Sequence, residues 1–484
     1  KSQDKQDELN VRLDKWLWAA RFYKTRSIAR DMVQGGKVHY NGQRTKPSKI
    51  VEVGAVVKLL QGVDEKVVTI EKILSPGGIT AWLVRDHSNP IISMRFSFRG
   101  GAGLDPKNRI GLANMAASLL DEGAGDLDSQ AFQQQLEDLV IRLRFRAGRD
   151  SLTGRLVTLA ANRDTAFTML SMALTQPRFD AEPVERIRGQ LLAEIRQDTE
   201  QPGAIAGRTL FKTLFPSHPY GRPTDGLEDD VAAITQADLK AFTAERLAKD
   251  NLIIGVVGDI KAETLATLLD STFGGLPAKA KSWALPEAIP QGAGRTIVVK
   301  KPVPQSSIVY AEKGLKRKHP DFYAAYVMNY VFGGGGFTSR LYEAIREKRG
   351  LAYSVYSGLH PLDKAGLIFG AAGTANANVG ETLRLLRQEW ARMAKDGMNE
   401  KELADAKTYL TGSYPLRFTS SGSIAAMLVG IQRDNLGIEY MDRRNSLIEA
   451  VSLEDVNRTA KNLLQADKLT VVVVGAPKGV KSSE

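Results

Sequence analysis

Segments with apolar residues at helical spacing alternate along this chain with short runs of β-branched residues, and one such helix-strand unit occurs twice. Residues 234–258 (ITQADLKAFTAERLAKDNLIIGVVG) return, shifted by 217 positions, as residues 451–475 (VSLEDVNRTAKNLLQADKLTVVVVG). Each copy begins with a capping residue, continues as an amphipathic helix and ends as an apolar strand that stops at a glycine. The pattern therefore predicts an architecture in which one unit is written twice.

A second pair of segments supports the duplication. Phe179-Asp180 opens a predicted helix that runs to Leu191, and Met398-Asn399 opens one that runs to Leu410, an offset of 219 positions. The two offsets differ by two residues, which small insertions or deletions explain. The predicted fold class is α+β, with two duplicated α/β-sandwich halves.

The first seventh of the chain has a different pattern. Residues 11–20 place four apolar side chains on one helical stripe: Leu13, Trp16, Leu17 and Ala20. Ser27 caps a second short predicted helix, with Arg30 outside and four apolar side chains facing inward: Ile28, Ala29, Met32 and Val33. Asn41-Gly42, a strong signal for a tight hairpin turn, starts a small sheet predicted to continue through residues 49–53 and 55–60.

At 484 residues, with 43% hydrophobic and 25% charged residues, the chain has an ordinary globular composition and a length that predicts about three domains. It has no cysteine, which excludes disulfides, thiol catalysis and cysteine-ligated zinc. No run of about eighteen uncharged apolar residues occurs and residues 1–10 are polar, so the sequence predicts neither a membrane span nor an export signal. Because the chain begins with Lys1 rather than Met, removal of an upstream segment stays open.

The net charge of +11 is unevenly placed. Residues 1–72 hold 15 basic and 9 acidic residues, a net charge of +6, and residues 12–49 hold ten basic residues against two acidic ones. Cations on a rigid helix pair beside a hairpin can contact successive phosphates, which is how proteins obtain most of their affinity for nucleic acids. The simpler alternative is a solvated positive face.

The segment from Val11 to Lys72 (VRLDKWLWAARFYKTR…AR…GGKVHYNGQRTKPSKIV) resembles the αL-motif RNA-binding domain of a ribosomal small-subunit protein, and more closely the ribosome-associated heat-shock protein 15 family. The resemblance implies binding to structured ribosomal RNA and the large ribosomal subunit, through six cations: Arg12, Lys15, Lys24, Arg26, Arg30 and Lys37. That family continues into a basic C-terminal extension, whereas a different sequence begins here after Ile73. We therefore expect reduced affinity for the ribosome.

The predicted domains are residues 11–72, 75–276 and 296–478, with residues 277–295 as a linker rich in Pro, Ala, Gly and Lys. The turn cluster Ser75-Pro76-Gly77-Gly78 begins the second domain. Its first predicted elements are strands at 79–84 and 91–98 and a helix at 110–120.

Residues 75–477 resemble the pitrilysin and insulinase superfamily of zinc peptidases, in the subgroup of mitochondrial processing peptidase and its bacterial relatives. The resemblance rests on four motifs in order: NPIISMRFSFRGGAGLDP, GLANMAASLLDEG, HPYGRPTDG and GGGGFTSRLYEAIREKRGLAYSVYSG. It implies two halves that close around an extended peptide. Active members carry an HxxEH motif on the first helix, where two histidines bind zinc and the glutamate activates water, while a later glutamate completes the coordination.

The zinc-binding residues of the family are replaced in this chain. The resemblance places Asn114 and Ser118 at the histidine positions, Ala117 at the position of the base and Glu194 at that of the third ligand. The five histidines are never closer than 41 residues, so no two lie four apart on one helix, and a zinc site would need carboxylates or distant histidines. We expect no metal and no peptidase activity from the chain alone. We also expect no nucleotide cofactor, because no GK[ST] follows Gly333–Gly336.

A second part of the family's site is retained. Family members hold the scissile carbonyl region with an arginine and a tyrosine seven positions apart in the second half, and Arg346 and Tyr353 have this spacing. Arginine offers a fork of donors and tyrosine a hydroxyl, both suited to carbonyl recognition. Spacing alone would favour a surface charge and a packed strand residue. Within LYEAIREKRGLAYSVYSG, however, the resemblance implies a peptide-binding pair.

These features favour a non-catalytic peptidase-like subunit that binds extended peptide and forms a heterodimer with an HxxEH-bearing homologue, while its N-terminal domain binds RNA. Two alternatives stay open. One is an RNA- or ribosome-associated heat-shock-type protein whose large region holds unfolded peptide, and the other is a chimaera of two functionally unrelated regions. The RNA-binding family implies the cytoplasm, whereas bacterial inactive peptidase-like subunits are often exported, which leaves the periplasm open for the large region.

Overall fold

The computed structural model describes residues 12–19, 23, 26–41, 43–51, 57–59 and 68–483. The chain forms two compact units that divide after Thr69.

The N-terminal unit is a helix pair with a small sheet, as the sequence predicts. Its elements are α2 (Leu13–Ala19), α3 (Arg26–Gln34), β1 (Val38–Tyr40), β2 (Gln43–Arg44) and β3 (Val57–Leu59). The strands lie in the order β2-β1-β3, and the core consists of Leu13, Leu17, Tyr23, Ala29, Val33, Val38 and Tyr40. The prediction for Ile28 is wrong, since this side chain is 42% exposed. Ala29 and Val33 define the buried stripe of α3, and Ile28 lies about 100° around the helix from Ala29.

The hairpin at Asn41 is confirmed. Asn41 has a φ of 50°, and β1 pairs antiparallel with β2, with His39 opposite Arg44. The strand predicted at 49–53 is not formed by residues 49–51, where Ile50 makes only an isolated bridge with Arg12. Residues 20, 52–56 and 60, which the predicted helix and sheet include, lie outside the described residues.

The second unit contains two sheets, each with its own set of helices. The first half comprises β4 (Glu71–Leu74), β5 (Thr80–Arg85), β6 (Ile91–Arg99), α4 (Leu112–Leu119), α5 (Ser129–Asp138), β7 (Arg142–Ala147), β8 (Ser151–Leu159), α6 (Arg163–Thr175), α7 (Ala181–Glu200), α8 (Pro202–Leu214), α9 (Glu228–Ala233), α10 (Gln236–Arg246), β9 (Leu252–Gly258) and α11 (Ala262–Phe273). Residues 277–295 form neither helix nor strand. The second half comprises β10 (Thr296–Lys300), β11 (Gln305–Lys313), α12 (Phe322–Asn329), the π-helical segments η5 (Tyr330–Gly334) and η7 (Tyr342–Glu347), β12 (Ala352–Pro361), β13 (Gly366–Ala375), α13 (Val379–Asp396), α14 (Glu400–Gly412), α15 (Ser421–Arg433), α16 (Tyr440–Glu449), α17 (Leu453–Leu463) and β14 (Thr470–Gly475).

The two sheets share one topology, which confirms the duplication. Their strand orders are β5-β9-β6-β8-β7 and β10-β14-β11-β13-β12, with β4 added at the edge of the first sheet. In each sheet the first two of these strands pair in parallel and the others pair antiparallel. The repeated helices α10 and α17 begin with the same capping box, formed by Thr235 with Asp238 and by Ser452 with Asp455. The predicted α+β class with two similar halves is therefore correct.

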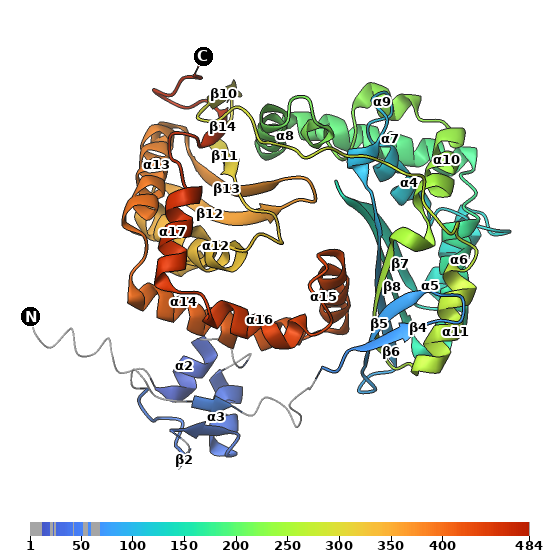
Figure 1. Cartoon of the computed structure of the whole chain (residues 1–484), viewed down its shortest axis with the longest axis horizontal. Coiled ribbons are helices and arrows are strands. Elements are labelled where there is room, and N and C mark those ends of the chain that lie inside the picture. Colours follow the sequence, from blue (N-terminus) through green and yellow to red (C-terminus); the bar gives the residue numbers. More distant parts are fainter. Residues whose placement is uncertain are drawn as a thin grey trace, which may run out of the picture. The chain divides into compact units, whose positions relative to one another are not determined.

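Each half places one helix on the sheet of the other half. α8 packs against β11 and β14, and α15 packs against β9 and β6, on the side of that sheet opposite α4, α6 and α11 (Figure 1). The turn between β12 and β13 adds a polar contact between the halves. The Tyr220 hydroxyl donates a hydrogen bond to Asp150 (2.6 Å) and accepts one from the backbone N–H of Lys364 (3.0 Å). These reciprocal contacts make the two halves one compact unit.

No helix within the described part of the chain has both the length and the apolar character that crossing a bilayer requires.

Candidate functional site

The four positions at which the family's metal site is expected lie on two helices that pack together. Asn114, Ala117 and Ser118 belong to α4, and Glu194 belongs to α7. Ala117 is buried, and the Ser118 hydroxyl donates a hydrogen bond to the backbone carbonyl of Asn114 (2.9 Å). Neither the Ala117 side chain nor the Ser118 side chain binds zinc as an imidazole or a carboxylate does.

The start of α4 is fixed by a buried carboxylate from the preceding loop. Gly111 adopts a φ of 105°, and both it and Ala113 donate backbone hydrogen bonds to Asp105, at 2.9 and 3.1 Å. Burial raises the pKa of Asp105 to about 7, although these hydrogen bonds oppose the shift. Asp105 therefore orients the helix on which the degenerate positions lie.

Asn114 and Glu194 line one cavity of about 390 Å³, together with residues of α8 and β7. Arg208, from α8, lines the same cavity and forms ion pairs with Asp198 (3.1 Å) and Asp225. A guanidinium group at this place neutralises the carboxylates and repels a divalent cation. The cavity is therefore polar, and the charges of Arg208, Asp198 and Asp225 in it are paired with one another.

Arg346 and Tyr353 lie exposed on the second half. Arg346 belongs to η7, and its guanidinium lies 4.9 Å from the centre of the Tyr342 ring. Tyr353 is 61% exposed and lies at a β-bulge in the edge strand β12. The described residues that line the Asn114 cavity all come from the first half, so the structure does not bring this pair to that cavity.

Five of the six predicted RNA contacts are exposed, and Lys24 lies outside the described residues. Arg12 and Arg26 form ion pairs with Asp14, at 3.0 and 3.3 Å, and Asp14 is only 2% exposed. Burial raises the pKa of Asp14, but hydrogen bonds from the two arginines more than offset this and hold the pKa below its ordinary value. Arg26 of α3 therefore ties the helix pair together through Asp14 of α2, whereas Arg12 pairs with Asp14 within one segment. The other exposed cations are Lys15, Arg30 and Lys37.

The described residues include no group of three His, Asp or Glu side chains placed to hold a metal ion. Sequence reasoning did not identify Asp14, Asp105 or Arg208. Asp14 had a signal, because it is one of two acidic residues among the ten cations of residues 12–49. No sequence pattern indicates the ion pairs of Arg208. They join two helices and a loop that only the tertiary fold brings together.

Two family models match the chain. The model described as S4 domain matches residues 11–57, and the model described as peptidase M16 inactive domain matches residues 233–410.

Similar proteins are found for both regions. The Helicobacter pylori protein named "Non-peptidase homolog YmxG" is 29% identical over 394 residues, which cover 81% of this chain and 91% of that protein. Heat shock protein 15 of Escherichia coli is 68% identical over 65 residues, which cover 13% of this chain and 49% of that protein, so the match spans about half its length. The crystal structure of a peptidase M16 inactive domain from Pseudomonas fluorescens matches with a TM-score of 0.80 and 29% identity, covering 86% of this chain and all of that one.

Proposed function

We propose that this chain, which joins an S4 RNA-binding domain to a peptidase M16 inactive domain, is a non-catalytic peptidase-like subunit that binds extended peptide and assists a metal-bearing homologue. The observation that carries the proposal is the composition of the degenerate site. Asn114, Ala117 and Ser118 replace the two imidazoles and the base, and Arg208 holds a positive charge in the cavity beside them. A partner with an HxxEH motif would supply the zinc and the activated water.

The second half would contribute the substrate contact in such a heterodimer. Arg346 and Tyr353 are both exposed, and Tyr353 lies in the edge strand β12, where an extended peptide would pair as an added strand. An arginine and a tyrosine hydroxyl stabilise charge that develops on a carbonyl oxygen, and this help is greatest in the transition state.

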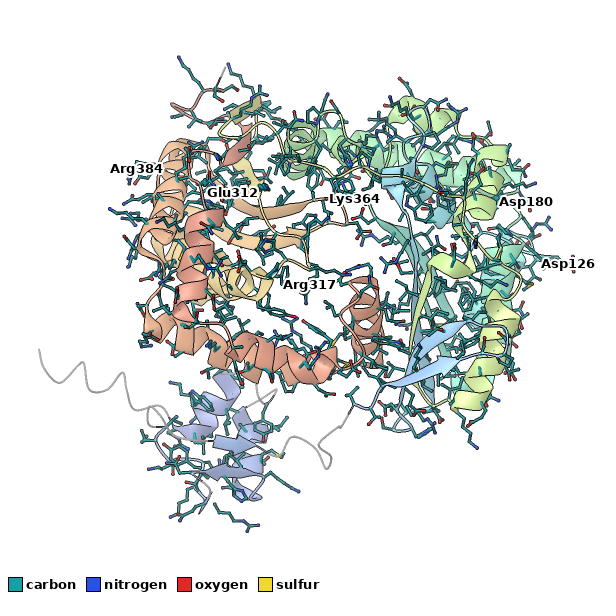
Figure 2. All side chains as sticks on the ribbon, in the orientation of Figure 1. Asp126, Asp180, Glu312, Arg317, Lys364 and Arg384 are labelled. Atoms are coloured by element: carbon teal, nitrogen blue, oxygen red, sulfur yellow. The ribbon has the colours of Figure 1, made fainter. Side chains whose placement is uncertain are left out.

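The peptide contact is tested in the mixture with an HxxEH-bearing homologue. We expect Arg346→Ala and Tyr353→Phe each to lower the peptidase rate of the mixture by about tenfold or more, because each removes a donor to the substrate. The rate of the homologue alone is the baseline. The control is Arg384→Ala, on an exposed part of α13 in the same half (Figure 2). Equal rates for all three variants would remove the proposed role of Arg346 and Tyr353.

The N-terminal domain is proposed to bind structured RNA of the large ribosomal subunit, which would place the protein in the cytoplasm. Lys15, Arg30 and Lys37 are exposed around a helix pair that the ion pair between Asp14 and Arg26 holds together. Lysines and arginines fixed in this way contact phosphates with little loss of conformational freedom.

RNA binding is tested with the full chain and a structured ribosomal RNA fragment. We expect Lys15→Ala and Arg30→Ala each to weaken binding by about threefold to tenfold and to reduce the salt dependence by about one phosphate contact. Lys401→Ala, on exposed α14, is the matched control. Unchanged affinity in the Lys15 and Arg30 double variant would contradict the proposed interface.

A second candidate function is favoured by the 68% identity to heat shock protein 15 over the S4 region. In that case the large region holds unfolded peptide at the ribosome without a peptidase partner. The two functions are distinguished by whether an HxxEH-bearing homologue forms a stable complex with this chain. Peptide binding with no such complex would favour the second.

A further inference from the structure

One side of the first-half sheet carries a row of arginines. Arg95 of β6 lies directly opposite Arg155 of β8, and Arg155 lies directly opposite Arg144 of β7. Arg142 and Arg146 stand two residues on either side of Arg144, on the same side of the sheet. The other side of the sheet at this row is apolar and buried, with Met94, Leu156 and Leu143. We call Arg95, Arg142, Arg144, Arg146 and Arg155 the arginine face.

This arrangement is unfavourable for the fold by itself. Adjacent strands lie about 4.8 Å apart, and like charges directly opposite each other on neighbouring strands repel. The Nε atoms of Arg95 and Arg155 are buried without a hydrogen-bond partner. Burial and the neighbouring charge of Arg155 lower the pKa of Arg95. Of the five, Arg144 forms an ion pair with Asp121 (3.1 Å).

The ordinary structural explanation covers only part of the face. Charged side chains on an edge strand prevent sheets from joining, which accounts for Arg142, Arg144 and Arg146 on β7. It does not account for Arg95 and Arg155, which lie on interior strands. The helix that packs on this side, α15, has the sequence SGSIAAMLVGIQR and brings no acidic residue to neutralise them.

The duplication provides an internal comparison. The equivalent row of the second sheet is Val309 of β11, Ala371 of β13 and Tyr356 of β12, paired in the same register. The fold therefore does not need charged side chains at these positions. The charge is a property of the first half alone.

We infer that the β7 arginines of the arginine face bind the acidic side chains of an extended peptide whose backbone pairs with the edge strand β7, while Arg95 and Arg155 add positive charge behind them. The inference rests on the proposed peptide binding and specifies its substrate class. A strand added to an edge points every second side chain to one side of the sheet, as do Arg142, Arg144 and Arg146. Carboxylates at every second peptide position would thus meet the guanidinium forks of β7. Arg146 also lines the cavity of Asn114 and Glu194, so this peptide would run past the degenerate site.

A nucleic-acid strand fits the same surface less well. Sites for single-stranded nucleic acid combine cations with aromatic side chains on which bases stack. The remaining positions on this side of β6 and β8 include Ser93, Ser97, Thr153 and Val157, and none of these is aromatic. An open strand edge, by contrast, offers backbone hydrogen bonds that match a peptide.

The test measures fluorescence anisotropy of labelled peptides with the full chain at low and physiological salt. One peptide alternates glutamate with threonine, and a matched peptide carries glutamine in place of glutamate. We expect the glutamate peptide to bind about tenfold more tightly, with a preference that falls as salt rises. The double variant Arg142→Gln with Arg146→Gln should abolish the preference, because these two exposed arginines lie on the strand beside the added peptide. Arg384→Gln, which removes one exposed charge from α13, should preserve it.

Folding of the double variant is checked by its melting temperature, which should be unchanged because Arg142 and Arg146 are both exposed. Equal binding of the two peptides would overturn the inference and leave the proposed peptide binding intact. Binding of neither would remove both. A uridine oligonucleotide that loses affinity in the double variant as strongly as the glutamate peptide would identify a nucleic-acid site and overturn the inference, since RNA held by the S4 domain is insensitive to these two residues.

Discussion

Glu312 is a buried carboxyl group at a position where the first half has Phe98. It accepts hydrogen bonds from the Trp390 indole N–H (2.6 Å) and the backbone N–H of Gln465 (3.1 Å) (Figure 2). Burial raises its pKa to about 8, and the hydrogen bonds oppose the shift only in part. The group is therefore protonated in the folded chain at pH values where the unfolded chain has lost the proton.

The consequence is a stability that falls with rising pH. Between the ordinary pKa of 4.5 and about 8, the folded state binds more protons at Glu312 than the unfolded state, so each step up in pH favours unfolding. We expect Glu312→Gln to make the fall in melting temperature between pH 5 and about 8 shallower. Some slope should persist, because burial also raises the pKa of Asp105, to about 7. The control is Glu381→Gln. The Glu381 carboxylate pairs with Arg384, and this pairing lowers the pKa of Glu381. Identical slopes for Glu312→Gln and the unaltered chain would contradict this account.

At the scale of elements, the same packing solution occurs in both sheets. Gly154 lies opposite Phe96, and Gly370 lies opposite Tyr310. A Cβ atom built on either glycine would stand 1.9 Å from the Phe96 ring or 2.2 Å from the Tyr310 ring. Because each glycine has no side chain, the aromatic ring on the neighbouring strand can lie directly over it. The same arrangement occurs in other sheets where an aromatic side chain covers a glycine.

We expect Gly154→Ala to lower the melting temperature, with a cost of about 1 to 3 kcal/mol for the forced shift of Phe96. Gly189→Ala is the matched control, because this glycine lies in α7 with open space around its Cβ position. That control should stabilise the chain by up to about 1 kcal/mol, since alanine favours helix. A neutral or stabilising Gly154→Ala would show that the ring relaxes without cost.

Much of this element structure could be predicted from local pattern. The helix predicted at 110–120 is α4 at Leu112–Leu119, and the strand predicted at 91–98 is β6 at Ile91–Arg99, because burial imposes its period on the sequence. The exchange of α8 and α15 could not be predicted, since an amphipathic helix does not specify which sheet it covers. Arg142, Arg144 and Arg146 alternate visibly in the sequence, but the alignment of Arg95 with Arg155 depends on strand register.

The candidate site likewise has some features that can be predicted from the sequence and others that cannot. The absence of two histidines four residues apart can be read from the sequence, so α4 carries no such pair. The ion pair of Arg208 with Asp198 in the cavity and that of Arg26 with Asp14 depend on contacts between separate elements. Ile28 shows the limit of a helical pattern in a short helix, where the buried stripe is only one or two residues wide.

At the scale of the molecule, the chain combines a segment that matches the S4 domain model with a duplicated unit that matches the peptidase M16 inactive domain model in part, and the halves of that unit pack a helix on each other's sheets. The charged row of the first-half sheet and the uncharged row of the second distinguish the two halves chemically.

The most direct test of the central claim measures zinc content and peptide hydrolysis by the purified full chain, alone and mixed with an HxxEH-bearing homologue. The account predicts no chelator-sensitive hydrolysis by the chain alone and a mixture more active than the homologue by itself. Stoichiometric zinc in the isolated chain, with hydrolysis that a chelator abolishes, would contradict it.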